Sequence, residues 1–222
     1  TFKSDPSGSL FLTFEVMKKI VYLSLLLLVS CGRFANQDKQ SDAATRIVCI
    51  AKQYNEIIFA LGAQKDLVAV DVSSTWPPAI KDLPTVGYHR ALSAEGILSM
   101  KPTLIIHDNN VGPEQVMTQL NELKIPMKVF DTKGDDIEST KALITEMGAY
   151  FHREQAADSI NKKLDADMAK ATAARAELKD KPKVVVIHYG RANNVYLTLT
   201  KNTTGGKMID WAGGEIPVEG ER

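Results

Sequence analysis

The amino-acid sequence predicts an α/β protein with two Rossmann-like lobes joined by a long α-helix, the second lobe being incomplete. Three observations support this prediction. From Arg46 onward, short apolar segments typical of strands alternate with helical patterns, as they do in a parallel sheet covered by helices. Residues 137–180 carry neither a strand pattern nor a proline. Strand-like apolar segments then return at Val184.

The first lobe is expected over residues 46–132, with four strands separated by helices. Strands are predicted at residues 47–50, 67–72, 104–107 and 127–130, and helices at residues 54–61, 92–100 and 113–124. Gly62 can end the first helix, Ser93 can cap the second, and Pro113 suits the first turn of the third. The loop at residues 73–78 ends in two prolines, so it continues neither a strand nor a helix.

Residues 133–180 are expected to form a helical linker. A break at residues 148–151 divides it, and the helix that follows, over residues 153–178, would extend roughly 39 Å at 1.5 Å per residue. That length is enough to join two lobes. The second lobe occupies residues 183–222, with strands at 184–187 and 195–199 and a helix at 204–211. Its 40 residues compare with 87 in the first lobe, so we expect it to be cut short.

The segment before the first lobe predicts export. Lysines follow Met17, and the ten-residue apolar run 20–29 comes next. A positive start, a short apolar run and a small residue before a cleavage site describe a secretory signal peptide over residues 17–30, because ten residues are too few to span a bilayer. Residues 1–16 precede this start methionine and are expected to be a non-native upstream segment.

Cys31 follows the signal directly. Residues 28–31, Leu-Val-Ser-Cys, resemble the bacterial lipobox, which implies that Cys31 becomes the lipid-modified first residue of the mature protein. Residues 31–45 are then the lipid anchor and a polar tether. We therefore expect a lipoprotein that is periplasmic or displayed on the cell surface.

Composition and motifs exclude several classes of function. The 27 basic residues balance 27 acidic ones, so no basic stripe predicts a nucleic-acid partner. Two cysteines cannot build a disulfide framework, and Cys49 lies in a strand where an unpaired thiol is most simply a core residue. The sequence contains no HExxH or GxSxG motif, and we expect no enzyme. A zinc hydrolase using His89, His107 and Asp108 is the weakest alternative.

Residues 46–214 resemble the substrate-binding proteins of ABC importers, in the class whose lobes are joined by a helical backbone. The stretches 46–48, 55–63 and 67–71 are similar to the opening of that class. Residues 83–98 contain Gly-Tyr-x-Arg-x-Leu-Ser-Ala-Glu-Gly and are similar to its haem-binding members. The resemblance implies a monomeric protein for iron acquisition, which captures haem as cargo and delivers it to a membrane permease. A corrinoid or ferric-siderophore cargo is the alternative within the same fold.

The resemblance also implies the iron ligand. In the haem-binding members the Tyr of this motif ligates ferric iron and a nearby Arg supports it, which corresponds to Tyr88 and Arg90. The chemistry agrees, because a neighbouring cation favours the phenolate and a phenolate is an axial ligand of haem iron. In an extended loop Tyr88 and Arg90 would share one side. His89 would then point away from both, so we expect little role for it.

Two further clusters are candidates for the pocket. His188, Tyr189 and Arg191 follow the first predicted strand of the second lobe and offer groups suited to iron and to haem propionates, with His188 as a candidate second iron ligand. His107 and Asp108 end a first-lobe strand, where α/β crevices open, although such a pair is more often structural.

Two roles are possible for each of Trp76 and Glu95. Trp76, beside two prolines, suits either the wall of an apolar pocket or simple packing. Glu95 lies where the resemblance implies an acidic residue that docks on permease arginines. A carboxylate at a helix start is also favoured by the helix dipole, which is the alternative explanation for Glu95.

Overall fold

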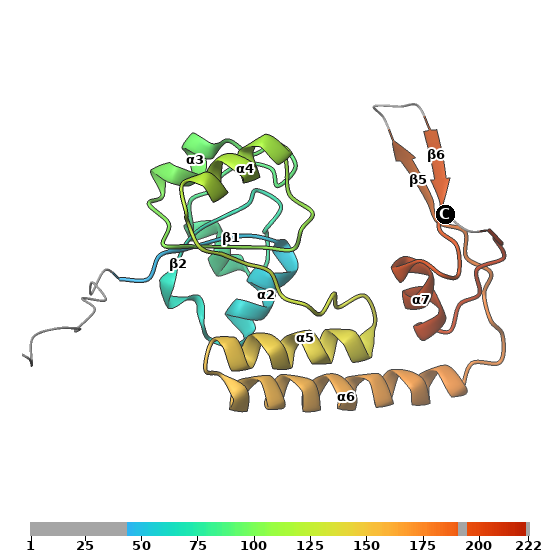
Figure 1. Ribbon diagram of the computed structural model, residues 1–222. Coiled ribbons are helices and arrows are strands. Elements are labelled where there is room, and N and C mark those ends of the chain that lie inside the picture. Colours follow the sequence, from blue (N-terminus) through green and yellow to red (C-terminus); the bar gives the residue numbers. More distant parts are fainter. Residues whose placement is uncertain (1–43, 191–194, 221–222) are drawn as a thin grey trace, which may run out of the picture. The chain divides into compact units, whose positions relative to one another are not determined.

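The computed structural model describes residues 44–190 and 195–220 of the chain (Figure 1). Several predictions therefore lie outside the described residues: the upstream segment, the signal peptide at 17–30, the lipid site at Cys31, and Arg191. In the described part of the chain, no helix is both long and apolar enough to cross a membrane.

A parallel sheet forms the centre of the first lobe, as predicted. Its strands lie in the order β2-β1-β3-β4. They are β1 (Ile47–Ile50), β2 (Leu67–Val70), β3 (Leu104–His107) and β4 (Met127–Lys128). β1 pairs with a strand on each side, Val48 lying opposite Ala69 of β2 and Ile105 of β3. The bounds of β1 and β3 match the prediction. β2 and β4 are shorter than predicted.

The two faces of the sheet bury two separate apolar clusters, which follow from the alternation of side chains along a strand. Ile47 and Cys49 pack with α2 (Lys52–Ala60) and α5 (Ile137–Tyr150), whereas Val48 and Ile50 pack with α3 (Ala94–Ser99) and α4 (Glu114–Glu122). All four residues of β1 are buried, as expected for a strand covered on both faces. Cys49 is thus a core residue as predicted, and burial raises the pKa of its thiol.

The helix ends are placed by local signals. Gly62 has a φ of +67° just after α2, a conformation that suits glycine. The Ser93 hydroxyl accepts a hydrogen bond from the Gly96 N–H at the start of α3. Pro113 is the residue before α4 rather than part of its first turn.

The linker divides as predicted, into α5 and α6 (Glu154–Ala176), which lie side by side (Figure 1). An Asp136–Ser139 capping box starts α5. The helices approach closely at Gly148, where an added Cβ would lie 2.5 Å from the Cβ of Ala157. Ala157 is buried, so the close approach requires a residue without a side chain at position 148.

We therefore predict that Gly148→Ala lowers the free energy of unfolding by about 1–3 kcal/mol, the usual cost of overpacking. Gly96→Ala is the matched control, because its Cβ would meet no atom closer than 3.8 Å and alanine favours a helix. Chemical denaturation should show a loss for the first variant and none for the second. Equal stability of the two variants would contradict the packing argument.

The second lobe differs in detail from the prediction. β5 (Ile187–Gly190) and β6 (Val195–Thr198) form an antiparallel hairpin, and α7 (Thr204–Trp211) has the predicted bounds. The strand predicted at 184–187 is displaced, because Val184 instead donates its N–H to the carbonyl of Glu215. Pairing with β6 selects residues 187–190. His188 and Tyr189 are consequently strand residues and not part of a loop after a strand.

Candidate functional site

A cavity opens where the order of the strands reverses. The chain passes from β1 to β2 on one side and then to β3 on the other side of β1. The carboxyl ends of two such strands diverge, and ligands of open α/β sheets bind in the resulting crevice. The switch-point cavity, of about 240 Å³, lies there. Its lining comes from the ends of β1 and β3, from the start of α2 and from the loops that carry Ser73 and Tyr88: Ile50, Ala51, Lys52, Gln53, Ser73, Tyr88, His89, Asp108 and Asn110.

The loop that carries Tyr88 is anchored to the edge of the sheet. Val86 donates its N–H to the carbonyl of Val70 at 2.9 Å, and Val72 donates to the carbonyl of Gly87 at 2.9 Å. Gly87 then turns the chain with a φ of +102°, a conformation rarely adopted by residues with a side chain. These bonds fix the position at which Tyr88 leaves the sheet.

The other side of this loop is tied to the segment after β3. The N–H of Gly112 donates to the carbonyl of His89 at 2.8 Å. The Arg90 guanidinium donates to Asn110 Oδ1 through Nε at 3.2 Å and Nη2 at 2.8 Å. Both recorded bonds of the guanidinium thus go to the neighbouring loop and not to the Tyr88 hydroxyl. Arg90 holds the loop in place, a contribution that the sequence did not indicate.

Tyr88 and His89 lie together, so the expectation that His89 points away is wrong. The loop is not extended, because Ala91 donates its N–H to the carbonyl of Tyr88 at 2.8 Å and closes a turn. The strict alternation of sides therefore does not apply. The two ring centroids are 4.3 Å apart, and both side chains line the cavity. Tyr88 is 47% exposed, which leaves it accessible to a ligand.

A buried carboxylate supports this arrangement from beneath. Asp71 is fully buried and accepts hydrogen bonds from the Ser73 N–H at 3.1 Å, from the Ser73 hydroxyl and from the Ser74 hydroxyl. Its Oδ2 also lies 3.5 Å from His89 Nδ1. The Asn55 amide donates to the Ser74 hydroxyl at 2.8 Å, which extends the network to α2. Asp71 was not predicted as a site residue, because the predicted second strand ran through it.

His107 has a structural role, whereas Asp108 lines the cavity. His107 is buried, its Nδ1 accepts a hydrogen bond from the Asn109 N–H at 3.2 Å, and burial lowers its pKa. This is the structural role expected for most such histidines. Asp108 lines the cavity, where its carboxylate accepts from the Gln53 amide and the Asn110 N–H. Among the described residues no group of three or more His, Cys, Asp or Glu side chains could hold a metal ion.

The remaining predicted residues lie elsewhere. His188 and Tyr189 are exposed on β5, and Tyr189 stacks on Tyr196 with ring centroids 4.8 Å apart. Neither lines the switch-point cavity. Glu95 is exposed in the first turn of α3, an accessible position for either of its two readings.

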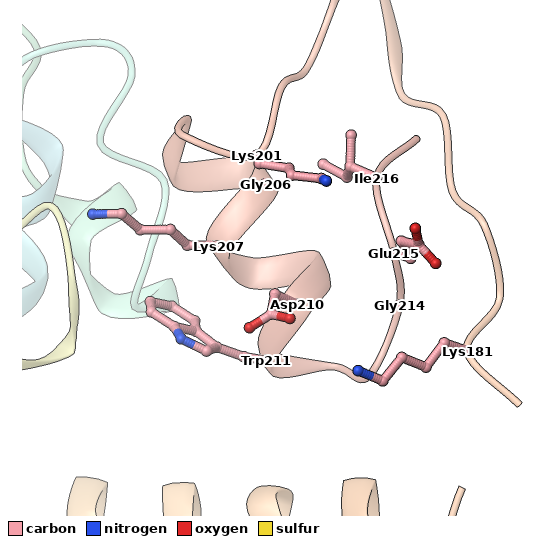
Figure 2. Close-up of a pocket in the computed structure, with 9 residues that line it drawn as sticks. All are labelled: Lys181, Lys201, Gly206, Lys207, Asp210, Trp211, Gly214, Glu215 and Ile216. Carbon is pink, nitrogen blue, oxygen red and sulfur yellow. The ribbon is translucent and has the colours of Figure 1, made fainter. Parts of the chain in front are cut away.

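Further cavities are lined by the described residues, and two of them bear on the site. The Trp76 cavity, of about 340 Å³, is lined by Gln53, Glu56, Ile57, Ala60, Trp76, Gly134, Thr140, Leu143, Ile144 and Ile160. Trp76 thus lines a largely apolar cavity, as in the first of the two roles considered for it, the wall of an apolar pocket. A third cavity, of about 570 Å³, is lined mainly by residues of α7 and of the segment that follows it. Figure 2 shows its mixed charges, with three lysines and two acidic residues among the side chains that line it: Lys181, Lys201, Lys207, Asp210 and Glu215. This mixture fits a flat apolar cargo poorly.

Comparison with known proteins adds relatives. The family model described as periplasmic binding protein matches residues 47–222. The vitamin B12-binding protein of Pectobacterium carotovorum subsp. carotovorum (strain PC1) is 30% identical over 112 residues, which cover 50% of this chain and 40% of that protein. The high-affinity heme uptake system protein IsdE of Staphylococcus aureus (strain Newman) is 25% identical over 205 residues, 90% of this chain and 66% of that protein. The chain therefore spans two fifths to two thirds of these relatives' length.

The solved structures to which the chain is similar include periplasmic heme-binding proteins. The apo periplasmic heme-binding protein RhuT from Roseiflexus sp. RS-1 has a TM-score of 0.68 and 32% identity, covering 78% of this chain and 65% of that chain. The periplasmic heme-binding protein HutB of Vibrio cholerae has a TM-score of 0.67 and 30% identity, covering 79% and 66%. Each similarity therefore extends over more than three quarters of this chain and about two thirds of the solved chain.

Proposed function

The chain belongs to the periplasmic binding protein family, and on that basis we propose that it is an extracytoplasmic binding lipoprotein that captures haem and delivers it to an ABC-importer permease. The observation that carries the proposal is Tyr88. A half-exposed phenol lies in a cavity at the switch point of the sheet, within the stretch 83–98 that is similar to haem binders. Relatives named for heme binding or uptake support the same cargo.

In this proposal Tyr88 supplies the axial ligand of the ferric iron. A phenolate is an axial ligand of haem iron, and Arg90, two residues along the loop, holds the loop that carries Tyr88 through its hydrogen bonds to Asn110. His188, Tyr189 and Arg191 of the second lobe are proposed as further haem contacts, with His188 a candidate second ligand. Lipid attachment at Cys31 would keep the protein beside the membrane that holds its permease.

A corrinoid is the second candidate cargo, because the vitamin B12-binding relative is 30% identical over half of this chain. Absorbance titration of the purified protein with hemin, and separately with cyanocobalamin, distinguishes the two. We expect hemin to shift its Soret band and to produce a phenolate-to-iron charge-transfer band, with cyanocobalamin binding far more weakly. Tight binding of cyanocobalamin without a spectral response to hemin would reverse the assignment.

For permease docking we predict that Glu95→Ala leaves hemin affinity unchanged but lowers haem transport in cells that contain the permease. Glu114→Ala is the matched control, because Glu114 is an exposed carboxylate in the first turn of α4, as Glu95 is in α3. A carboxylate at a helix start contributes about 0.3–1 kcal/mol, so both variants should lose similar, small amounts of stability. If transport is normal in Glu95→Ala, the helix-dipole explanation holds instead.

A further inference from the structure

The switch-point cavity and the Trp76 cavity adjoin along one face of α2. Gln53 lines both of them, and Ile57 and Ala60 continue the lining of the second. Residues at these spacings share one side of a helix. From Gln53 to Ala60 the helix rises about 10 Å, which is comparable to the breadth of a porphyrin ring. A flat ligand bound at Tyr88 can therefore reach across Gln53 into the Trp76 cavity.

The Trp76 cavity has the composition of a site for an apolar edge. Trp76 is 61% exposed, which is a large fraction for an indole. Beside it lie the apolar side chains of Ile57, Leu143 and Ile144. Ligand pockets are lined mainly by apolar and aromatic groups, and an exposed indole gives a flat surface on which a conjugated ring can pack.

The charges that line the two cavities favour one orientation of such a ligand. Glu56 lies in the Trp76 cavity, and its carboxylate would repel the two propionates of haem. Lys52 lines the switch-point cavity, and its ammonium would attract them. Asp108, also in that cavity, already accepts hydrogen bonds from the Gln53 amide and the Asn110 N–H. Among the described residues, the switch-point cavity therefore holds one charge of each sign, on Lys52 and Asp108, whereas the only charged group that lines the Trp76 cavity is the Glu56 carboxylate. This difference favours propionates near Lys52 and the opposite edge of the macrocycle near Trp76.

We propose that the Trp76 cavity receives the apolar, vinyl-bearing edge of haem, while Tyr88 holds the iron and Lys52 faces the propionates. The proposal rests on haem being the cargo. It assigns Trp76 a role in recognising the porphyrin itself, independent of the metal. Trp76 and Tyr88 thus report on two separate parts of the ligand.

The test compares hemin with iron-free protoporphyrin IX, which keeps the ring edges and lacks the metal. Trp76→Ala should weaken the binding of both ligands about tenfold, which is within the range for losing one aromatic anchor. Trp76→Phe should retain most of the affinity. Tyr88→Phe should weaken hemin alone. Trp211→Phe, which changes the other tryptophan of the chain, should change neither affinity.

A second arm tests the direction of the ligand. Lys52→Ala should weaken hemin several-fold and leave hemin dimethyl ester, whose propionates are uncharged, unaffected. Unchanged binding of both porphyrins by a folded Trp76→Ala variant would overturn the edge assignment, while a selective hemin loss in Tyr88→Phe would leave the haem function standing. An equal loss of hemin and its ester in Lys52→Ala would overturn the direction. Absence of porphyrin binding by the unaltered protein would overturn both proposals.

Discussion

Replacement of Tyr88 by phenylalanine is expected to lower hemin affinity about hundredfold or more, equivalent to at least about 2.7 kcal/mol, and to abolish the phenolate-to-iron charge-transfer band. The reason is that phenylalanine keeps the ring and its packing on His89 but cannot bond to iron. The fold should be unaffected, because the side chain is half-exposed. Absorbance titration gives the affinity, and thermal unfolding of the unliganded protein gives the control for folding.

The contribution of Arg90 can be separated into charge and position. Arg90→Ala removes both the cation and the hydrogen bonds to Asn110. Asn110→Ala removes the hydrogen bonds alone and leaves the cation. If the charge favours the phenolate, Arg90→Ala should weaken hemin binding several-fold more than Asn110→Ala, and equal losses would indicate that Arg90 acts by holding the loop.

One pair of results would contradict the assignment of Tyr88 as the iron ligand. A Tyr88→Phe variant that binds hemin with an unchanged spectrum, together with a His89→Ala or His188→Ala variant that does not, would move the iron to a histidine. His89 is now the stronger of these two competitors, because it lines the same cavity as Tyr88. The binding-protein fold would be unaffected by that outcome.

Elements with strong local signals could be predicted from the sequence. β1 is a continuous run of apolar residues, and β3 is such a run up to its last residue, His107. The start of α3 is fixed by Ser93, whose hydroxyl accepts a hydrogen bond from the N–H three residues along the chain. The strand at 184–187 was predicted on the same grounds and is wrong. Its placement depends on Glu215, which is distant in sequence, and on the register of pairing with the next strand, β6. Tertiary pairing here overrides local strand preference.

In the candidate site too, local signals could be predicted from the sequence, whereas contacts between distant segments could not. Tyr88 was predicted as a site residue because it lies in a contiguous stretch with a recognisable pattern, whereas its environment could not be predicted from that stretch. The turn that brings His89 beside Tyr88 is held by Gly112, and the Arg90 guanidinium is held by Asn110, twenty residues away. Gln53 lines two cavities because both open along one face of α2. Such positions depend on the register of the sheet and the course of the loops.

Asp71→Ala is expected to lower the free energy of unfolding by about 3 kcal/mol and to loosen the Tyr88 loop. The carboxylate is fully buried and accepts from one N–H and two hydroxyls of Ser73 and Ser74. Removing a buried acceptor leaves its donors unpaired, at about 1–3 kcal/mol for each group that finds no other partner. His89 would also lose the neighbour that lies 3.5 Å from its Nδ1.

Denaturation and amide hydrogen exchange test this prediction together. Ser73→Ala is the matched control, since it removes one hydroxyl donor and keeps the carboxylate, so its cost should be about 1 kcal/mol. The amides of Ala91 and Gly112, whose hydrogen bonds close the Tyr88 loop, should exchange faster in Asp71→Ala relative to those of β1. A stability within about 0.5 kcal/mol of the parent, with unchanged exchange at both amides, would show that the Asp71 network does not support the loop. Loss of stability with faster exchange confined to the loop would instead mean that the buried Asp71 carboxylate holds Tyr88, the proposed iron ligand, in position.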